Sequence, residues 1–323
     1  MPRPVWLYAV LSQTLQGIRV LDFSQNLPGP YLTHVLHALG ATVIKIEPPT
    51  GDPLRHLPPD GEVYRRLNNG KQIFCLDLKT QEGCDAAIAL VRESHVVIES
   101  FRVGVLDRLG LGFSALKAVQ SHVIMCSIRG FGNDPGRAGH DLGFMAASGM
   151  LHALGGEIPR VQIADQVGGG LFGVIAVLAS LLNNLRNDPI ARHIEIPMTD
   201  ALRGLFAMEL SGVPGILTGA LPSYRLYRTQ DARFVAVAAL EPKFFTILCN
   251  ALDVPELANS GLCMGDEGAY TVARLQEIFE AHPLAHWRDV LGGIDACCEA
   301  VLTPTEAWGC DRPPALPVRE VDF

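Results

Sequence analysis

Apolar residues in the first part of the chain form short runs, separated by segments in which they recur at helical spacing. The short runs are rich in branched residues and predict buried strands at 17–24, 42–49, 72–78, 95–101 and 121–131. The apolar spacing at 31–41 and 82–94 predicts helices. This alternation is typical of an α/β domain, in which a mostly parallel sheet carries helices on both faces.

The pattern changes near residue 190. A strand at 233–240 and helices at 241–252, 273–282 and 286–293 follow a Gly- and Pro-rich connection at 214–227. We therefore predict a large domain at 1–190 with a short C-terminal return segment at 306–323, a linker at 191–214 and a smaller α+β domain at 215–305. The longest apolar run, 171–182, is too short to cross a bilayer and predicts a buried core helix without a membrane span.

Ligands of parallel sheets bind beyond the carboxyl ends of the strands. The loops 46–56, 68–71, 99–104 and 129–141 should therefore converge on one side of the sheet. Any one cation in these loops is most simply a surface charge, but a converging set would suit a phosphorylated ligand. The set comprises Arg55, Lys71, Arg102, Arg129 and Arg137.

Composition narrows the possible partners. The net charge of −8 argues against sequence-independent binding to nucleic acid or to an anionic membrane, which requires a basic surface. The eight cysteines lack the spacing of zinc or redox motifs and fit a reducing compartment, so we expect a cytoplasmic protein. Dinucleotide, P-loop, nucleophile-elbow and zinc-site motifs are all missing from the sequence, so we predict no metal and no nucleotide cofactor.

Three acidic or basic residues are candidates for catalysis. His140 precedes a predicted helix, where it is either a hydrogen-bonded helix-start residue or a general base, and Asp141 beside it is expected to be the N-cap. Asp165 stands before Gly168–Gly170 and is either a simple N-cap or a base or nucleophile, with the glycines allowing a ligand to approach backbone oxyanion donors. Glu241 follows a strand and would matter only if it reached a histidine.

Several ordered blocks of the sequence, among them HALGATVIKIEPPTGDPLR, IRGFGNDPGRAGHD and ADQVGGG, resemble the family III CoA-transferases, and within that superfamily the α-methylacyl-CoA racemases. The resemblance implies a Rossmann-like large domain, a small domain and an interlocked homodimer. It also implies that His140, Asp165 and Glu241 are catalytic. The five cations would bind CoA, which is part of an acyl-CoA substrate and not a separate cofactor.

The resemblance leaves two reactions open. In the racemase reading, His140 and Asp165 stand on opposite faces of the substrate α-carbon and exchange its proton through an enolate, while Glu241 orients His140. The alternative is a family III CoA-transferase, in which Asp165 forms a mixed anhydride with the acyl group. Aspartate is present in both groups, whereas the histidine of the GHD motif is typical of the racemases.

Overall fold

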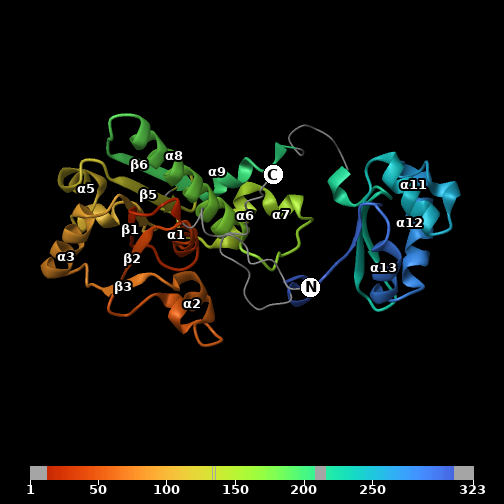
Figure 1. Ribbon diagram of the computed structural model, residues 1–323, viewed down its shortest axis with the longest axis horizontal. Helices are drawn as coiled ribbons and strands as arrows, with labels where there is room; N and C mark the ends of the chain where they lie inside the picture. Colours follow the sequence, from red (N-terminus) through yellow and green to blue (C-terminus); the bar gives the residue numbers. More distant parts are fainter. Residues whose placement is uncertain (1–12, 133, 135, 208–215, 309–323) are drawn as a thin grey trace. The chain divides into compact units, whose positions relative to one another are not determined.

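The computed structural model describes residues 13–132, 134, 136–207 and 216–308. The chain divides into two compact units, with the main segment of the first ending at Phe206 and the second beginning at Ala207 (Figure 1). The predicted linker of 191–214 contains β6 (Arg192–Pro197) and α9 (Met198–Arg203). Because β6 pairs with the neighbouring strand of the large sheet, this part of the range belongs to the first unit and is not a linker.

The first unit is built on a six-stranded parallel sheet with the order β3-β2-β1-β4-β5-β6. This order matches the doubly wound arrangement that the alternating pattern predicted. The strands are short and almost wholly buried in the middle of the sheet, which explains their continuous apolar runs. Before β6 they are β1 (Arg19–Asp22), β2 (Thr42–Glu47), β3 (Gln72–Cys75), β4 (Val96–Glu99) and β5 (Ile124–Arg129).

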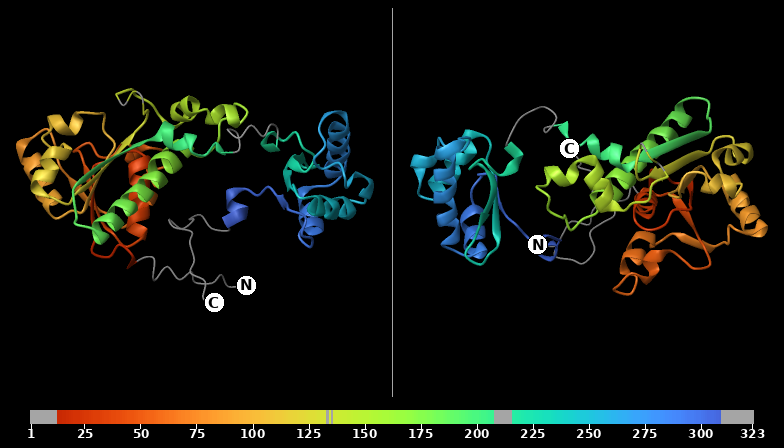
Figure 2. Two further views of the ribbon diagram at one scale, coloured as in Figure 1. Left: turned by 90° about the horizontal axis from the view of Figure 1, so that it is seen from above. Right: turned by 180° about the vertical axis from the view of Figure 1, so that it is seen from behind.

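Helices cover both faces of the sheet, and successive strand residues alternate between two cores (Figure 2). One core joins β1, β4 and β5 to α1 (Pro28–Ala38) and α8 (Phe172–Arg186). The other joins the same strands to α3 (Gln81–Arg92) and α5 (Phe113–Val119). The remaining helical segments of this unit are η2 (Pro53–His56), α2 (Glu62–Asn68), α4 (Val105–Arg108), α6 (Asp141–Ser148), α7 (Met150–Ala153) and the π-helix η3 (Ala164–Leu171).

The apolar run at 171–182 belongs to a longer helical stretch than the sequence indicated. η3 and α8 together span Ala164–Arg186, which is long and apolar enough to cross a membrane by length and composition alone, a test that core helices of globular proteins also pass. The prediction of a buried core helix is only partly right, because α8 buries one side. On its other side Ile175, Leu182 and Leu185 are 61%, 47% and 83% exposed.

The second unit packs three helices against a small antiparallel sheet of order β7-β8-β9. The sequence predicted β8 (Phe234–Ala238) and the helices α11 (Pro242–Ala251), α12 (Gly265–Glu280) and α13 (Leu284–Leu291). It missed β7 (Tyr224–Arg228), which overlaps the end of the stretch interpreted as a connection, and β9 (Cys298–Ala300). Short segments complete the unit: η4 (Ile216–Thr218), η5 (Pro255–Leu257) and α14 (Pro304–Trp308).

The predicted return segment, 306–323, lies mostly outside the described residues. Its first part is the end of α14, where Glu306 forms an ion pair with Arg233 at 2.8 Å. Arg233 immediately precedes β8, so this contact is internal to the second unit.

Candidate active site

A cavity of about 520 Å³ opens at the carboxyl ends of the central strands of the first unit. Its wall comes from the loops after β1, β4 and β5, from the segment before α6, and from η3 and α9. β1 and β4 are adjacent in the sheet although β2 and β3 lie between them in the sequence, so the cavity sits where the strand order reverses. This is the place where doubly wound folds bind their ligands. The lining residues are Gln25, Asn26, Pro28, Ser100, Phe101, Arg102, Ile128, Arg129, Gly130, Arg137, Ala138, Gly139, His140, Phe144, Asp165 and Met198.

Two of the four predicted loops, 99–104 and 129–141, reach this cavity, whereas 46–56 and 68–71 do not line it. Gln25 and Asn26 also line the cavity, from the loop that follows β1, and were not among the predicted site residues. The signal was available, because two polar residues directly after a buried strand stand at the ligand-binding edge of a parallel sheet.

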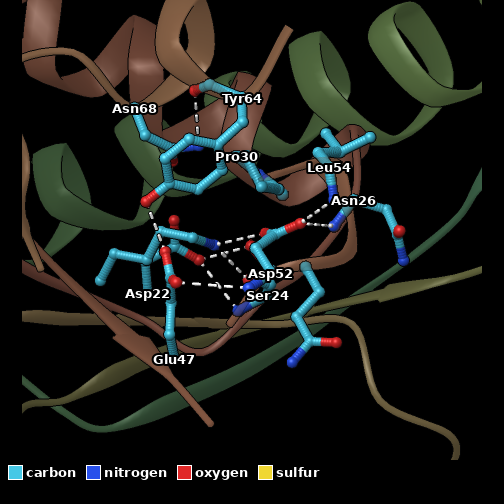
Figure 3. A network of polar contacts seen from close by, with 12 residues as sticks. Asp22, Ser24, Asn26, Pro30, Glu47, Asp52, Leu54, Tyr64 and Asn68 are labelled. Carbon is cyan, nitrogen blue, oxygen red and sulfur yellow. Dashed lines mark hydrogen bonds and ion pairs between the residues drawn. The ribbon is translucent and has the colours of Figure 1, made fainter. Parts of the chain in front are cut away.

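A buried polar network fixes the loop that carries Gln25 and Asn26 (Figure 3). Lys45 on β2 donates to the Ser24 carbonyl at 2.7 Å and forms an ion pair with Asp52 at 3.1 Å, with both charged side chains fully buried. Asp52 in turn accepts a hydrogen bond from the backbone N–H of Asn26 at 3.4 Å. Asn26 has φ of 63°, a left-handed conformation that asparagine tolerates better than most residues.

Lys71 belongs to the same network. Its ammonium donates to Pro30, Thr33 and Asn68 at 2.8–2.9 Å and lies 3.6 Å from Asp22. Burial is the largest cause that lowers the pKa of Lys71, to about 8, while the charge of Asp22 opposes this effect. The donors of Lys71 are thus engaged within the protein, and the residue does not line the cavity, so its predicted role in CoA binding stays a prediction.

Arg55 is also engaged within the protein and does not line the cavity. Its guanidinium lies 2.7 Å from Glu47, donates to the Tyr64 hydroxyl at 2.5 Å and stacks on the Tyr64 ring at 4.0 Å. The side chain remains 39% exposed. Its prediction as a CoA contact is untested.

The other three predicted cations line the cavity, but they differ in their availability. Arg129 at the end of β5 forms an ion pair with the buried Glu99 at 2.6 Å and donates to the Phe101 carbonyl at 2.9 Å. Its charge is therefore largely compensated, and its contact fixes the loop after β4. Arg102 and Arg137 are exposed, and the guanidinium of Arg137 lies 4.3 Å from the centre of the Phe131 ring. Arg102 and Arg137 are the cations best placed to meet a phosphorylated ligand.

His140 is the N-cap residue of α6 and lines the cavity. Its carbonyl accepts hydrogen bonds from the backbone of Gly143 and Phe144, while its side chain makes no capping hydrogen bond. The preceding Gly139 has a steric role, since a Cβ there would lie 2.6 Å from the Phe144 ring. The local fold therefore keeps the imidazole at the cavity and leaves it exposed.

Asp165 faces the same cavity from the first turn of η3 and is the only residue of this helix in its wall. Burial, and then the negative charge of Asp141, raise the pKa of the Asp165 carboxyl to about 7. A carboxyl with such a pKa both holds and releases a proton near neutral pH. The structure therefore brings the two predicted catalytic residues of the first unit, His140 and Asp165, to one cavity.

Asp141 does not cap its own helix, contrary to the sequence prediction, because His140 takes that position. Its carboxylate instead accepts a hydrogen bond from the backbone N–H of Asp165 at 2.9 Å. The interaction joins the start of α6 to the start of η3, which are 24 residues apart in the sequence.

The three glycines after Asp165 serve packing and not the approach of a ligand. They are buried, and added Cβ atoms would lie 3.1 Å from the Met198 carbonyl at Gly168, 2.9 Å from Pro28 at Gly169 and 2.5 Å from the Tyr31 ring at Gly170. η3 thus packs its backbone against α1 and α9. Because these glycines do not line the cavity, the expected oxyanion donors at Gly168–Gly170 are not placed to bind a ligand there.

Glu241 is the N-cap of α11 in the second unit and is exposed. Since His140 belongs to the first unit, the pairing of these two side chains stays a prediction. In the described ranges, no three histidine, cysteine, aspartate or glutamate side chains are grouped so as to hold a metal ion.

Comparisons with known proteins agree with this architecture. The sequence model of CoA-transferase family III matches residues 15–312. The chain is 31% identical to human alpha-methylacyl-CoA racemase, with 90% of this chain and 78% of the racemase covered. It is 33% identical to succinate–glutarate CoA-transferase of Agrobacterium fabrum, with coverages of 76% and 68%. A crystal structure of a CAIB/BAIF family protein from Brucella suis superposes with a TM-score of 0.79 at 27% identity, covering 92% of this chain and 86% of that one.

Proposed function

We propose, from the premise that this chain belongs to CoA-transferase family III, that it is an epimerase of 2-methylacyl-CoA thioesters. The family includes racemases and CoA-transferases, so membership alone gives an enzyme that acts on CoA thioesters. The observation that supports the racemase reaction is the placement of His140 and Asp165 in the wall of one cavity. Two proton-transfer groups at one site are what inversion of a carbon centre requires.

The reaction follows from the acidity of the carbon next to a thioester carbonyl. One of the two groups, His140 or Asp165, takes the α-proton, and the bonding electrons move into a planar enolate. The other group then delivers a proton to the opposite face, which inverts the configuration. The roles reverse for the other epimer, so each group must exchange a proton near the working pH, as the raised pKa of Asp165, about 7, allows.

The negative charge on the enolate oxygen needs hydrogen-bond donors. Since Gly168–Gly170 are buried and do not line the cavity, the donors would come from the backbone near Asp165 or from the side-chain amides of Gln25 and Asn26 in the wall. Arg102 and Arg137 would hold phosphate groups of CoA. Glu241 would orient His140 and favour its charged form, with the glutamate supplied within an interlocked homodimer.

The test is proton exchange in D₂O. One epimer of a 2-methylacyl-CoA is incubated with the protein, and deuterium incorporation and loss of optical purity are followed by mass spectrometry and chiral analysis. His140→Ala should reduce both rates by about 10²–10⁴-fold, the usual contribution of a general acid–base group. Arg186→Ala, on the exposed end of α8, is the matched control. A wild-type protein without any α-deuterium incorporation between pH 5 and 9 contradicts the epimerase.

The alternative is a CoA-transferase, which is favoured by relatives of equal similarity and by the position of Asp165 in the cavity. Here the Asp165 carboxylate attacks the thioester carbonyl, the carbon–sulfur bond breaks, and the CoA thiolate leaves as a mixed anhydride forms. Hydroxylamine would convert that anhydride to a hydroxamate at Asp165. Transfer of CoA between two carboxylates that persists in His140→Ala, together with this adduct, would replace the epimerase with the transferase.

A further inference from the structure

Asp141 and Asp165 form an acidic pair that the two-base reaction itself does not require. The first residue of α6 reaches the first turn of η3, where its carboxylate accepts the Asp165 N–H at 2.9 Å. Both residues are only partly exposed, and both belong to the first unit. The contact therefore joins the two helix starts that carry His140 and Asp165.

The Asp141 carboxylate accepts its hydrogen bond from a helix other than its own. Asp141 directly follows the N-cap of α6, where a carboxylate would ordinarily favour the start of its own helix. Here it instead satisfies an unpaired backbone N–H at the start of a second helix. A neutral acceptor would also satisfy this N–H. The negative charge of Asp141 has a separate effect, because it raises the pKa of the neighbouring Asp165 carboxyl.

We propose that Asp141 is a positioning residue of this site: it fixes the first turn of η3 and, through its charge, keeps a proton on the Asp165 carboxyl. The proposal rests on the proposed epimerase, because a group that returns a proton to an enolate must first hold one. A nucleophilic aspartate in a transferase has the opposite need, since only the ionised form attacks a carbonyl. The Asp141 charge therefore favours proton transfer over acyl transfer.

Other charged groups surround η3 and have to be separated from the effect of Asp141. Burial is the largest cause that raises the pKa of Asp165, and Asp141 is the charge that adds to it. Burial also raises the pKa of Asp141, while hydrogen bonds from the Asp165 and Ala164 backbone lower it. The titratable groups of the cavity wall and of the elements packed against η3 are Arg102, Arg129, Arg137, His140, Tyr31, His34, His37, Asp200, Arg203, His193, Glu195, Arg192 and Arg186.

The variant Asp141→Asn separates charge from geometry, because asparagine keeps a carbonyl acceptor for the Asp165 N–H. Asp141→Ala removes both functions. Asp85→Asn, on the exposed side of α3, changes the net charge equally and far from the site in the sequence, and is the matched control. Asp165→Asn identifies the carbon resonance of Asp165 in protein labelled with ¹³C at aspartate carboxyls.

The experiment titrates that resonance in the ligand-free protein and then measures the pH dependence of α-proton exchange. In Asp141→Asn the pKa of Asp165 should fall by about 1 unit or more. The limb of the pH–rate profile that reports the ionisation of Asp165 should move to lower pH by the same amount. The Asp165 amide proton shift should stay near the wild-type value in Asp141→Asn and change in Asp141→Ala. Asp85→Asn should leave the titration unchanged.

An unchanged Asp165 titration in a folded Asp141→Asn protein overturns the proposal, whatever the enzyme does. A protein that shows the expected titration but catalyses no exchange leaves the Asp141 interaction intact and instead contradicts the epimerase. The two failures are therefore distinguishable.

Discussion

The Arg129 guanidinium lies 2.6 Å from the Glu99 carboxylate, and the exposed fractions of the two side chains are only 8% and 2%. The pair joins the ends of β5 and β4, and Arg129 is part of the cavity wall. A cation that was expected to contact a ligand is thus balanced by a buried carboxylate from the neighbouring strand.

Removal of the Glu99 charge should destabilise the protein, because the buried Arg129 would lose its nearer carboxylate and keep only the ion pair with the more exposed Glu195 at 3.4 Å. For Glu99→Gln we expect the free energy of unfolding to fall by up to about 3–5 kcal/mol, measured by urea denaturation. Glu93→Gln removes the carboxylate of the exposed pair with Arg19 and should cost less than about 1 kcal/mol. Equal effects of the two substitutions would contradict the structural role assigned to Arg129.

The exposed arginines of the cavity wall should govern binding of the CoA thioester. Arg102→Ala and Arg137→Ala each remove a potential charged hydrogen bond, commonly about 1.5–3 kcal/mol, so KM should rise by about 10–100-fold with a smaller change in kcat. The effect should weaken as salt is added. Arg186→Ala should leave KM unchanged, and a KM unaffected by both cavity variants would exclude these two residues from CoA binding.

Asp165 should make stability depend on pH in an unusual direction. Its pKa is about 7 in the folded protein, against 3.8 for an aspartate in an unstructured peptide, so between these values the folded state binds more protons than the unfolded state. Stability from this group is present below about pH 4 and is lost as the pH rises through about 7. Asp165→Asn should therefore change the free energy of unfolding little at pH 4 and raise it by roughly 1–4 kcal/mol at pH 8.

Urea denaturation at the two pH values measures this difference. Asp85→Asn provides the control, because Asp85 is exposed on α3. An Asp165→Asn protein that gains no stability over wild type between pH 4 and pH 8 would show that the folded and unfolded pKa values coincide.

The glycine face of η3 should tolerate no side chain at its contact with α1. In Gly170→Ala the new Cβ would lie 2.5 Å from the Tyr31 ring, so either the ring or the helix must move. We expect a loss of about 1–3 kcal/mol in the free energy of unfolding. Gly143→Ala on α6 has open space around the new Cβ and should be neutral or stabilising. Similar melting temperatures for the two variants would refute tight packing of η3.

Sequence patterns predicted the parallel sheet because its central strands β1, β2, β4 and β5 are buried on both faces and leave continuous apolar runs. β7 was missed because its sequence, YRLYR, has neither strict alternation nor a continuous apolar run, and only Tyr227 is fully buried. The position of the site also followed from chain order, since ligand loops lie at carboxyl ends of parallel strands.

Pairing between distant residues could not be predicted in the same way. Arg129 and Arg102 are both arginines in converging loops, and only the three-dimensional structure shows that one is balanced by Glu99 while the other is exposed. Asp141 likewise has the local sequence of a cap, but its acceptor is used by a helix 24 residues later. Such choices depend on tertiary contacts that local spacing does not encode.

The π-helical form of η3 makes the direction of Asp165 depend on the number of residues between it and α8. A π-helix accommodates more residues in each turn than an α-helix does. If the same residues wound as an α-helix, with about 3.6 residues per turn, Asp165 would point to a different side of the helix axis. α8 could then keep its packing while the carboxyl left the cavity. The wide turn of η3, and not the residues of the cavity wall alone, therefore directs Asp165 into the cavity.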